Sequence, residues 1–77
     1  MIIMDKKDEI KKIIESKTEN NISYDENFIS NGKVDSLKFV EIMIELENRF
    51  EITIPDDKLN MLRLNSVDNI ISELFDE

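Results

Sequence analysis

Residues Ser36 to Glu51 constrain the fold more than any other segment, because they predict a helix that is apolar on nearly every side. One stripe at helical spacing consists of Val40, Met43, Ile44, Leu46 and Phe50. Three further apolar residues widen it almost around the helix: Leu37, Phe39 and Ile42. A helix with so little polar surface needs partners on several sides. We therefore expect it at the centre of an all-α domain.

Two other segments predict amphipathic helices. The segment from Asp5 to Lys17, with Asp5 as the expected N-cap, continues a narrow apolar stripe that begins at Ile3 and includes Ile10, Ile13 and Ile14. A last helix, capped by Asn65 or Ser66, has an unbroken apolar stripe made of Val67, Ile70, Ile71, Leu74 and Phe75. Both stripes are narrow enough for each helix to cover one side of the central helix.

The connecting segments complete the expected architecture. Asn20 to Val34 is a long first loop with many turn formers. Its scattered apolar residues should attach it to the core, and they are Ile22, Tyr24, Phe28 and Ile29. Pro55 predicts the start of a short helix from Asp56 to Leu62, whereas Ile52 to Ile54 alternates like a strand but has no pairing partner. We expect one domain, residues 1–77, with three longer helices and a short third one.

The composition excludes several classes of function. The chain has no cysteine and no histidine, which removes thiolate metal sites and hydrolases of the Ser-His-Asp kind. An enzyme is therefore the least favoured class. A formal net charge of −8 disfavours nucleic acids and anionic membranes and favours protein partners with basic patches. With no signal-peptide pattern at Met1 to Met4 and no apolar stretch long enough to cross a membrane, we expect a cytoplasmic monomer.

The loop around Gly32 also resembles a calcium-binding loop in part. Asn31, Gly32 and Asp35 occupy suitable positions of a twelve-residue EF-hand loop. However, Ile29 stands where an oxygen ligand is needed, and Lys38 stands where a bidentate carboxylate is needed. We therefore expect no metal site, and an unmodified helical interaction or calcium-sensing module is kept only as an alternative function.

Asp35-Ser36-Leu37, at the start of the predicted central helix, carries the most specific signal. A lone serine at a helix start is usually an N-cap. Here the triplet follows Phe28 and Gly32 and precedes an acidic helix that ends in Phe50 and an Ile-Pro-Asp step at Ile54. This combination, spread over essentially the whole chain, resembles the acyl carrier protein family.

The resemblance implies a four-helix bundle of acyl-carrier type, in which Ser36 receives a 4′-phosphopantetheine arm from coenzyme A. It implies that a separate phosphopantetheinyl transferase attaches the arm and that loading ligases and synthases or transferases with basic patches then use it. The implied docking residues are Asp35, Leu37, Glu41, Ile44 and Glu47. The candidates for an acyl pocket are Phe28, Val40, Leu46, Ile54 and Leu62, although core packing is the simpler expectation for each of these five.

The resemblance leaves two kinds of cargo open. The first is an acyl group in fatty-acid, polyketide or related biosynthesis. The second is an aminoacyl or D-alanyl group, because the segment from Val40 to Phe50 and Val34-Asp35 resemble D-alanyl carrier proteins. Lys38 departs from the acid that is usual in fatty-acid carriers. Leu37 and the absence of tryptophan depart from the D-alanyl carriers, which usually have methionine after the serine and a tryptophan near the C-terminus.

Overall fold

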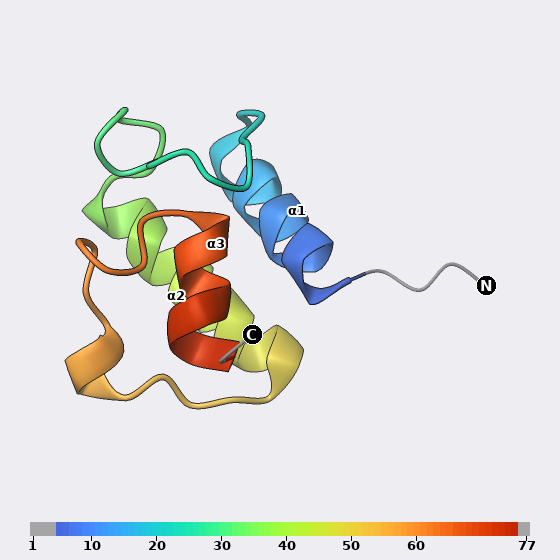
Figure 1. Cartoon of the computed structure of the whole chain (residues 1–77), viewed down its shortest axis with the longest axis vertical. Helices are drawn as coiled ribbons and strands as arrows, with labels where there is room; N and C mark the ends of the chain where they lie inside the picture. Colours follow the sequence, from blue (N-terminus) through green and yellow to red (C-terminus); the bar gives the residue numbers. More distant parts are fainter. Residues whose placement is uncertain (1–4, 76–77) are drawn as a thin grey trace.

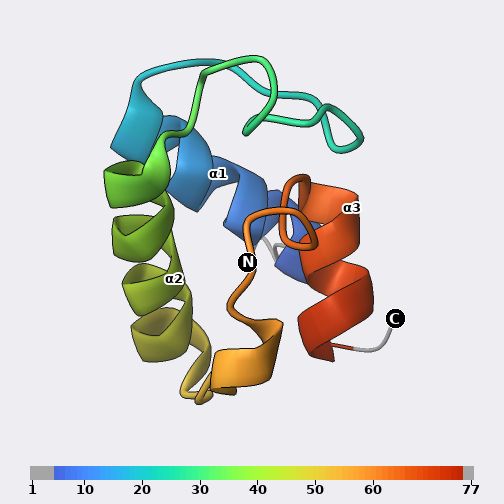
Figure 2. The same ribbon diagram turned by 90° about the vertical axis from the view of Figure 1, so that its left-hand side faces the viewer.

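The computed structural model describes residues 5–75, and over this range it contains helices and no strand. The helices in chain order are α1 (Lys6–Thr18), α2 (Ser36–Phe50), the 3₁₀ turn η1 (Asp56–Lys58), α3 (Val67–Ile70) and the π-helical turn η2 (Ile71–Phe75). Figure 1 shows α2 beside α1, and Figure 2 shows α2 and the last helix on opposite sides of the molecule, with loops closing over the two ends. The predicted Ile3 and the run from Met1 to Met4 lie outside the described residues.

The all-α class and both long helices are confirmed. The predicted start of α2 at Ser36 is confirmed, whereas both ends of α1 and the end of α2 differ by one residue from the predicted bounds. The core lies where the three helices meet, and its fully enclosed side chains include Ile10, Ile14, Ile42, Leu46 and Ile70. No described helix has both the length and the apolar character needed to cross a membrane.

The predicted short helix from Asp56 to Leu62 is wrong in extent. Only Asp56–Lys58 is helical, as a single 3₁₀ turn, so the described chain has three helices and a short turn instead of four helices. The Asn60 side chain explains the early end, because its Oδ1 accepts a hydrogen bond from the Leu62 amide at 2.8 Å. An asparagine that bonds to the backbone in this way competes with helix continuation.

The last helix is capped as the sequence predicts. Ser66 is the N-cap, and its hydroxyl accepts from the Asn69 amide at 3.1 Å. Val67 and Ile70 are fully buried, whereas Leu74 and Phe75 are partly buried against the core. The chain leaves α-geometry after Ile70 and finishes in the π-helical turn η2, which periodicity alone does not predict.

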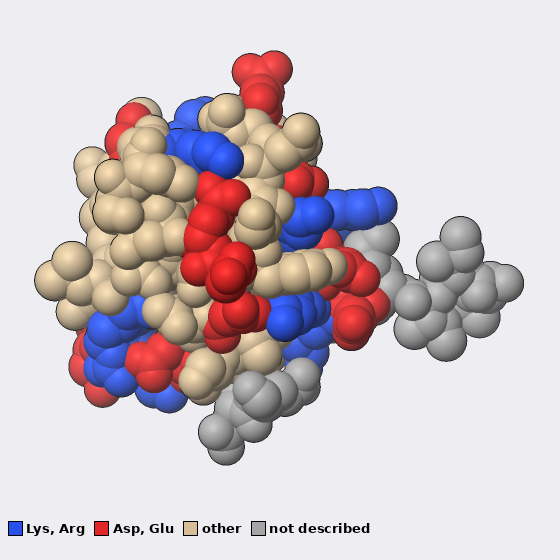
Figure 3. Space-filling view, turned by 45° about the horizontal axis from the view of Figure 1, so that its top comes forward, with Lys and Arg blue, Asp and Glu red and all other residues tan. Residues whose placement is uncertain are grey.

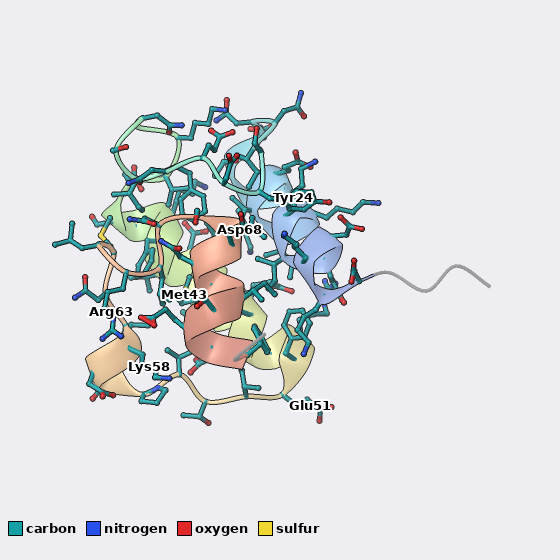
Figure 4. All side chains as sticks on the ribbon, in the orientation of Figure 1. Tyr24, Met43, Glu51, Lys58, Arg63 and Asp68 are labelled. Atoms are coloured by element: carbon teal, nitrogen blue, oxygen red, sulfur yellow. The ribbon has the colours of Figure 1, made fainter. Side chains whose placement is uncertain are left out.

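The first loop is attached to the last helix by two backbone hydrogen bonds. The Phe28 amide donates to the Asn65 carbonyl, and the Asp68 amide donates to the Tyr24 carbonyl, each at 3.0 Å. Figure 4 shows Tyr24 and Asp68 next to each other where the loop crosses the start of α3. Ile22 and Phe28 are buried, and Tyr24 and Ile29 are partly buried against the core, which confirms that these apolar residues fix the long loop to the core. The segment that leads to α2 is therefore anchored to the rest of the fold before Ser36.

Both long helices end in the same way. Glu19 after α1 and Glu51 after α2 adopt left-handed backbone geometry, with φ angles of 57° and 54°, and each donates its amide to the carbonyl four residues earlier. Left-handed geometry is unfavourable for a residue that carries a Cβ atom. A glutamate carboxylate in the last turn of each helix accepts a hydrogen bond from the amide of an isoleucine beyond the helix. Glu15 accepts from Ile22, and Glu47 accepts from Ile54.

Candidate functional site

The start of α2 presents Ser36 to solvent with its hydroxyl unused. The helix is capped by Asp35, whose Oδ1 accepts from the Lys38 amide at 2.8 Å. Ser36 is the first helical residue, and within residues 5–75 its hydroxyl has no hydrogen-bond partner. The simpler expectation, that this serine is the N-cap, is therefore wrong. Asparagine and aspartate are preferred caps, so Asp35 was the sequence signal for this arrangement.

The position of Ser36 suits an anionic substituent. The first amides of a helix have no acceptor within the helix, and the helix dipole places partial positive charge at this end. A phosphodiester on the Ser36 hydroxyl would lie in that region. The residues present therefore fit a phosphopantetheine group: an exposed, unbonded hydroxyl, a cap provided by a different residue, and a chain without cysteine to supply a thiol.

The loop that leads to Ser36 is shaped by a hydrogen-bond network that the sequence did not reveal. The Glu26 carboxylate accepts from the Ser23 amide at 2.6 Å, from Asn31 Nδ2 at 2.7 Å and from Lys33 Nζ at 2.8 Å. Lys33 Nζ also donates to the Asn21 carbonyl at 2.7 Å. The hydrogen bond from Lys33, with the others, lowers the pKa of Glu26 to about 2. We call these five residues the Glu26 network.

The geometry of the loop does not resemble a calcium site. Asn27 Oδ1, the first EF-hand position, already accepts from the amides of Ile29 and Ser30. Lys38 lies 3.8 Å from a Glu41 carboxylate oxygen, so its charge points toward the acid. Within residues 5–75 no three carboxylate, histidine or cysteine side chains gather in a way that could hold a metal ion. Gly32 has a φ of +82°, so the turn itself requires glycine there.

The predicted docking residues fall into two groups. Leu37 and Ile44 are exposed, at 69% and 53%, and they share one face of α2 with Val40, which is 49% exposed. Asp35 is also exposed, and Glu41 lies half-buried beside Lys38. Figure 3 shows an almost uncharged surface next to a row of acidic side chains. An exposed apolar face bordered by acids suits a partner that presents apolar and basic groups.

Glu47, the fifth predicted docking residue, has a role inside the molecule. Its Oε2 accepts from the Ile54 amide at 2.8 Å, and its carbonyl accepts from the Ile52 amide at 3.1 Å. The side chain is half-buried, and its carboxylate faces the segment that follows α2. A buried amide without an acceptor is costly, and Glu47 removes that cost for Ile54.

The five acyl-pocket candidates are not brought together. Phe28, Leu46 and Ile54 are buried in the core, as expected for packing residues. Val40 and Leu62 are exposed, at 49% and 81%, so the expectation that they pack in the core is wrong. For Val40 the reason is that α2 buries the face made of Phe39, Ile42, Met43 and Leu46. For Leu62 the Asn60 turn ends the helix and directs the chain outward.

A groove of about 530 Å³ lies elsewhere, between α1 and α2. Its lining consists of Glu9, Lys12, Ile13, Ser16, Lys17, Glu45 and Arg49. Arg49 crosses the groove and pairs with Glu9 at 3.2 Å and Glu45 at 3.4 Å, which confirms the pair of Glu45 and Arg49 that the helical spacing favours. A groove lined mainly by charged side chains does not suit an alkyl chain.

Comparison with known proteins shows the family of the chain. Residues 8–74 match the family model described as the phosphopantetheine attachment site. The chain is 37% identical to the D-alanyl carrier protein of Streptococcus mutans over 70 residues, which cover 88% of this chain and 89% of that protein. It is 38% identical to the D-alanyl carrier protein of Streptococcus suis strain 05ZYH33 over 71 residues, covering 90% of each.

A third relative extends the match. The D-alanyl carrier protein of Leuconostoc mesenteroides is 30% identical over 73 residues, which cover 92% of this chain and 94% of that protein. The family model spans most of the chain, and the relatives align over nearly their full length. The cofactor of such a protein is covalently attached 4′-phosphopantetheine. The chain belongs to the family of phosphopantetheine-dependent carrier proteins and resembles the D-alanyl carriers within it.

Proposed function

We propose that this chain is a single-domain carrier that holds a D-alanyl group as a thioester on a 4′-phosphopantetheine arm attached to Ser36. The observation that carries the proposal is the exposed Ser36 hydroxyl, left free by the Asp35 cap at the start of α2. The D-alanyl cargo is supported by the names of the relatives from Streptococcus and Leuconostoc.

The chain's own residues provide attachment and presentation, whereas the chemistry comes from outside. When bound, the arm supplies the thiol that this cysteine-free chain lacks. The chain has no histidine, and the Asp35 carboxylate beside Ser36 is occupied by the Lys38 amide. Activation of the Ser36 hydroxyl therefore belongs to a separate transferase. The α2 start contributes its unpaired amides and its dipole, which stabilise the attached phosphodiester.

The packing favours a small cargo over a long alkyl chain. Phe28 and Leu46 have no exposed surface, and Ile54 is 5% exposed, so these pocket candidates are enclosed by neighbouring side chains. The groove between α1 and α2 is lined mainly by charged residues. A D-alanyl group is small and carries an ammonium, so it needs no apolar tunnel. A fatty-acyl cargo, the first of the two cargoes considered, would require the core to open.

The partners follow from the same surface. We propose that a transferase, an amino-acid-activating ligase and an acceptor enzyme bind in turn to the exposed apolar face made of Leu37, Val40 and Ile44. Asp35 and Glu41 at its border would attract basic groups on each partner. Because the Glu47 carboxylate already accepts a hydrogen bond from the Ile54 amide, we expect Glu47 to contribute less than Glu41 to the contacts with partners.

Intact mass spectrometry tests the attachment site. The protein is incubated with coenzyme A and a broad-specificity phosphopantetheinyl transferase, beside the variants Ser36→Ala and Ser72→Ala. Ser72 is an exposed serine in the last helix, so it controls for the loss of a surface hydroxyl. We expect one phosphopantetheine on the wild type and on Ser72→Ala and none on Ser36→Ala. A Ser36→Ala protein that still gains the arm would refute the assignment.

The cargo is tested on the loaded protein. A D-alanine-activating ligase with ATP and D-alanine should add one alanyl group, removable by hydroxylamine as thioesters are. A fatty-acyl ligase should load the same protein poorly. Efficient fatty-acyl loading with no alanyl loading would favour the acyl carrier instead. A folded wild-type protein that no transferase modifies would favour the unmodified interaction module.

A further inference from the structure

The Glu26 network lies on the surface of the first loop, next to the start of α2. Glu26 joins Ser23, which lies earlier in the loop, to Asn31 and Lys33, which lie in the loop tip. Lys33 extends the network to the Asn21 carbonyl. Figure 1 shows this part of the loop folded back above the beginning of α2. The network therefore fixes the shape of the segment that leads directly to Ser36.

The core of the protein does not need this network. Phe28 and Val34 hold the base of the loop, because both are buried and the Val34 amide donates to the Phe28 carbonyl at 2.9 Å. The tip between them, from 29 to 33, is mostly exposed, and Ser30, Asn31 and Gly32 are all exposed. Its shape depends on polar contacts, of which the Glu26 network provides the charged ones. Within the tip, Ile29 is partly buried against the core, and the polar contacts order the exposed remainder.

We infer that Glu26 is a positioning residue, which holds the loop tip 29–33 in one shape beside Ser36 so that a phosphopantetheinyl transferase binds the tip together with the start of α2. The inference rests on the proposed function, because it takes Ser36 as the modified residue. An ordered loop lowers the entropy that an enzyme must remove on binding.

Three substitutions separate the network from the rest of the loop. Glu26→Gln places an amide nitrogen where the carboxylate now accepts from Asn31 and Lys33, so it breaks the network with little change in size. Lys33→Met removes the cation, whereas Lys33→Arg keeps it. Glu51→Gln is the matched control for charge, since Glu51 is exposed at the far end of α2 and Figure 4 shows it directed into solvent.

Steady-state kinetics of coenzyme A-dependent modification are measured for all five proteins, with thermal unfolding of each and hydrogen exchange of the loop amides. We expect Glu26→Gln and Lys33→Met to raise the KM for the carrier about fivefold, the scale of ordering one or two side chains on binding. Their kcat should change less, and amide exchange should accelerate in residues 29–33 only. Lys33→Arg and Glu51→Gln should behave like the wild type.

The outcomes are distinct. Equal KM values in all five proteins would overturn the inference and leave the proposed function intact. A raised KM that comes with a matching loss of stability in the whole fold would also overturn it, because Glu26 would then be a general stabilising residue. A wild-type protein that gains no phosphopantetheine at all would overturn the proposed function, and this inference with it.

Discussion

Replacing Asp35 by alanine should destabilise the protein, whereas replacing its neighbour Ser36 should not. Asp35→Ala removes the acceptor of the Lys38 amide, and loss of an N-cap costs about 1 kcal/mol. The lost negative charge at the helix start adds roughly 0.3–1 kcal/mol. Ser36→Ala removes an exposed hydroxyl without a described partner, so its effect should stay within about 0.5 kcal/mol.

Urea and thermal unfolding, both followed by circular dichroism, measure the two changes. Asp35→Ala should lower the melting temperature by about 4–8 °C per kcal/mol in a domain of this size. Asp35→Asn keeps an acceptor at the same position and loses only the charge, so it should lower the free energy of unfolding by roughly 0.3–1 kcal/mol. The reasoning is refuted if Ser36→Ala lowers the free energy of unfolding by about 1 kcal/mol and Asp35→Ala does not. In that case Ser36 caps α2 in solution, and its hydroxyl is not free.

Three further predictions concern the glutamates. Glycine at Glu19 or Glu51 should raise the free energy of unfolding by about 0.5–1 kcal/mol in urea titrations, because it relieves left-handed strain; a loss of stability would contradict this geometry. Glu47→Ala should lower the free energy of unfolding by about 1–3 kcal/mol, because the Ile54 amide loses its acceptor. Hydrogen exchange of the Ile54 amide should also accelerate in this variant. An exchange rate equal to that of the wild type would contradict the hydrogen bond between Glu47 and Ile54. The carboxyl carbon of Glu26 should titrate near pH 2 by NMR. Since its pKa is lowered in the folded state, its stabilising contribution is complete above the unfolded pKa of 4.5 and is lost as the pH falls toward 2; a midpoint near 4.5 would show that the network is absent.

Helical spacing predicts α1 and α2 well because apolar residues recur along each of these segments with the period of a helix. Helical spacing does not predict which face of α2 is buried, because apolar side chains lie on nearly every side of that helix. Phe39, Ile42 and Met43 point to the core, and Leu37 and Ile44 point to solvent. Contacts with elements far away in the sequence decide which face is buried. A pattern within one segment contains no information on such contacts.

The site shows a similar division. Asp35-Ser36-Leu37 marks the position of the serine, and the structure adds that Asp35 takes the capping role. The residues of the Glu26 network look like ordinary polar loop residues in the sequence, which does not show that their side chains are joined. Asn60 likewise looks like one more polar residue in a short helix, although its side chain ends that helix. Each of these outcomes depends on a side chain that bonds to the backbone, and periodicity does not predict such bonds.

The hydrogen bonds that attach the first loop to the last helix have a consequence for the order in which the protein folds. They join residues about 40 positions apart, and forming such contacts requires closing a long stretch of chain at an entropic cost. α3 and η2 together are far shorter than an isolated helix needs to be stable in water. The last helix therefore forms only on a surface that α1, α2 and the loop already provide. We therefore expect it to join late in folding and to detach first when the protein begins to open.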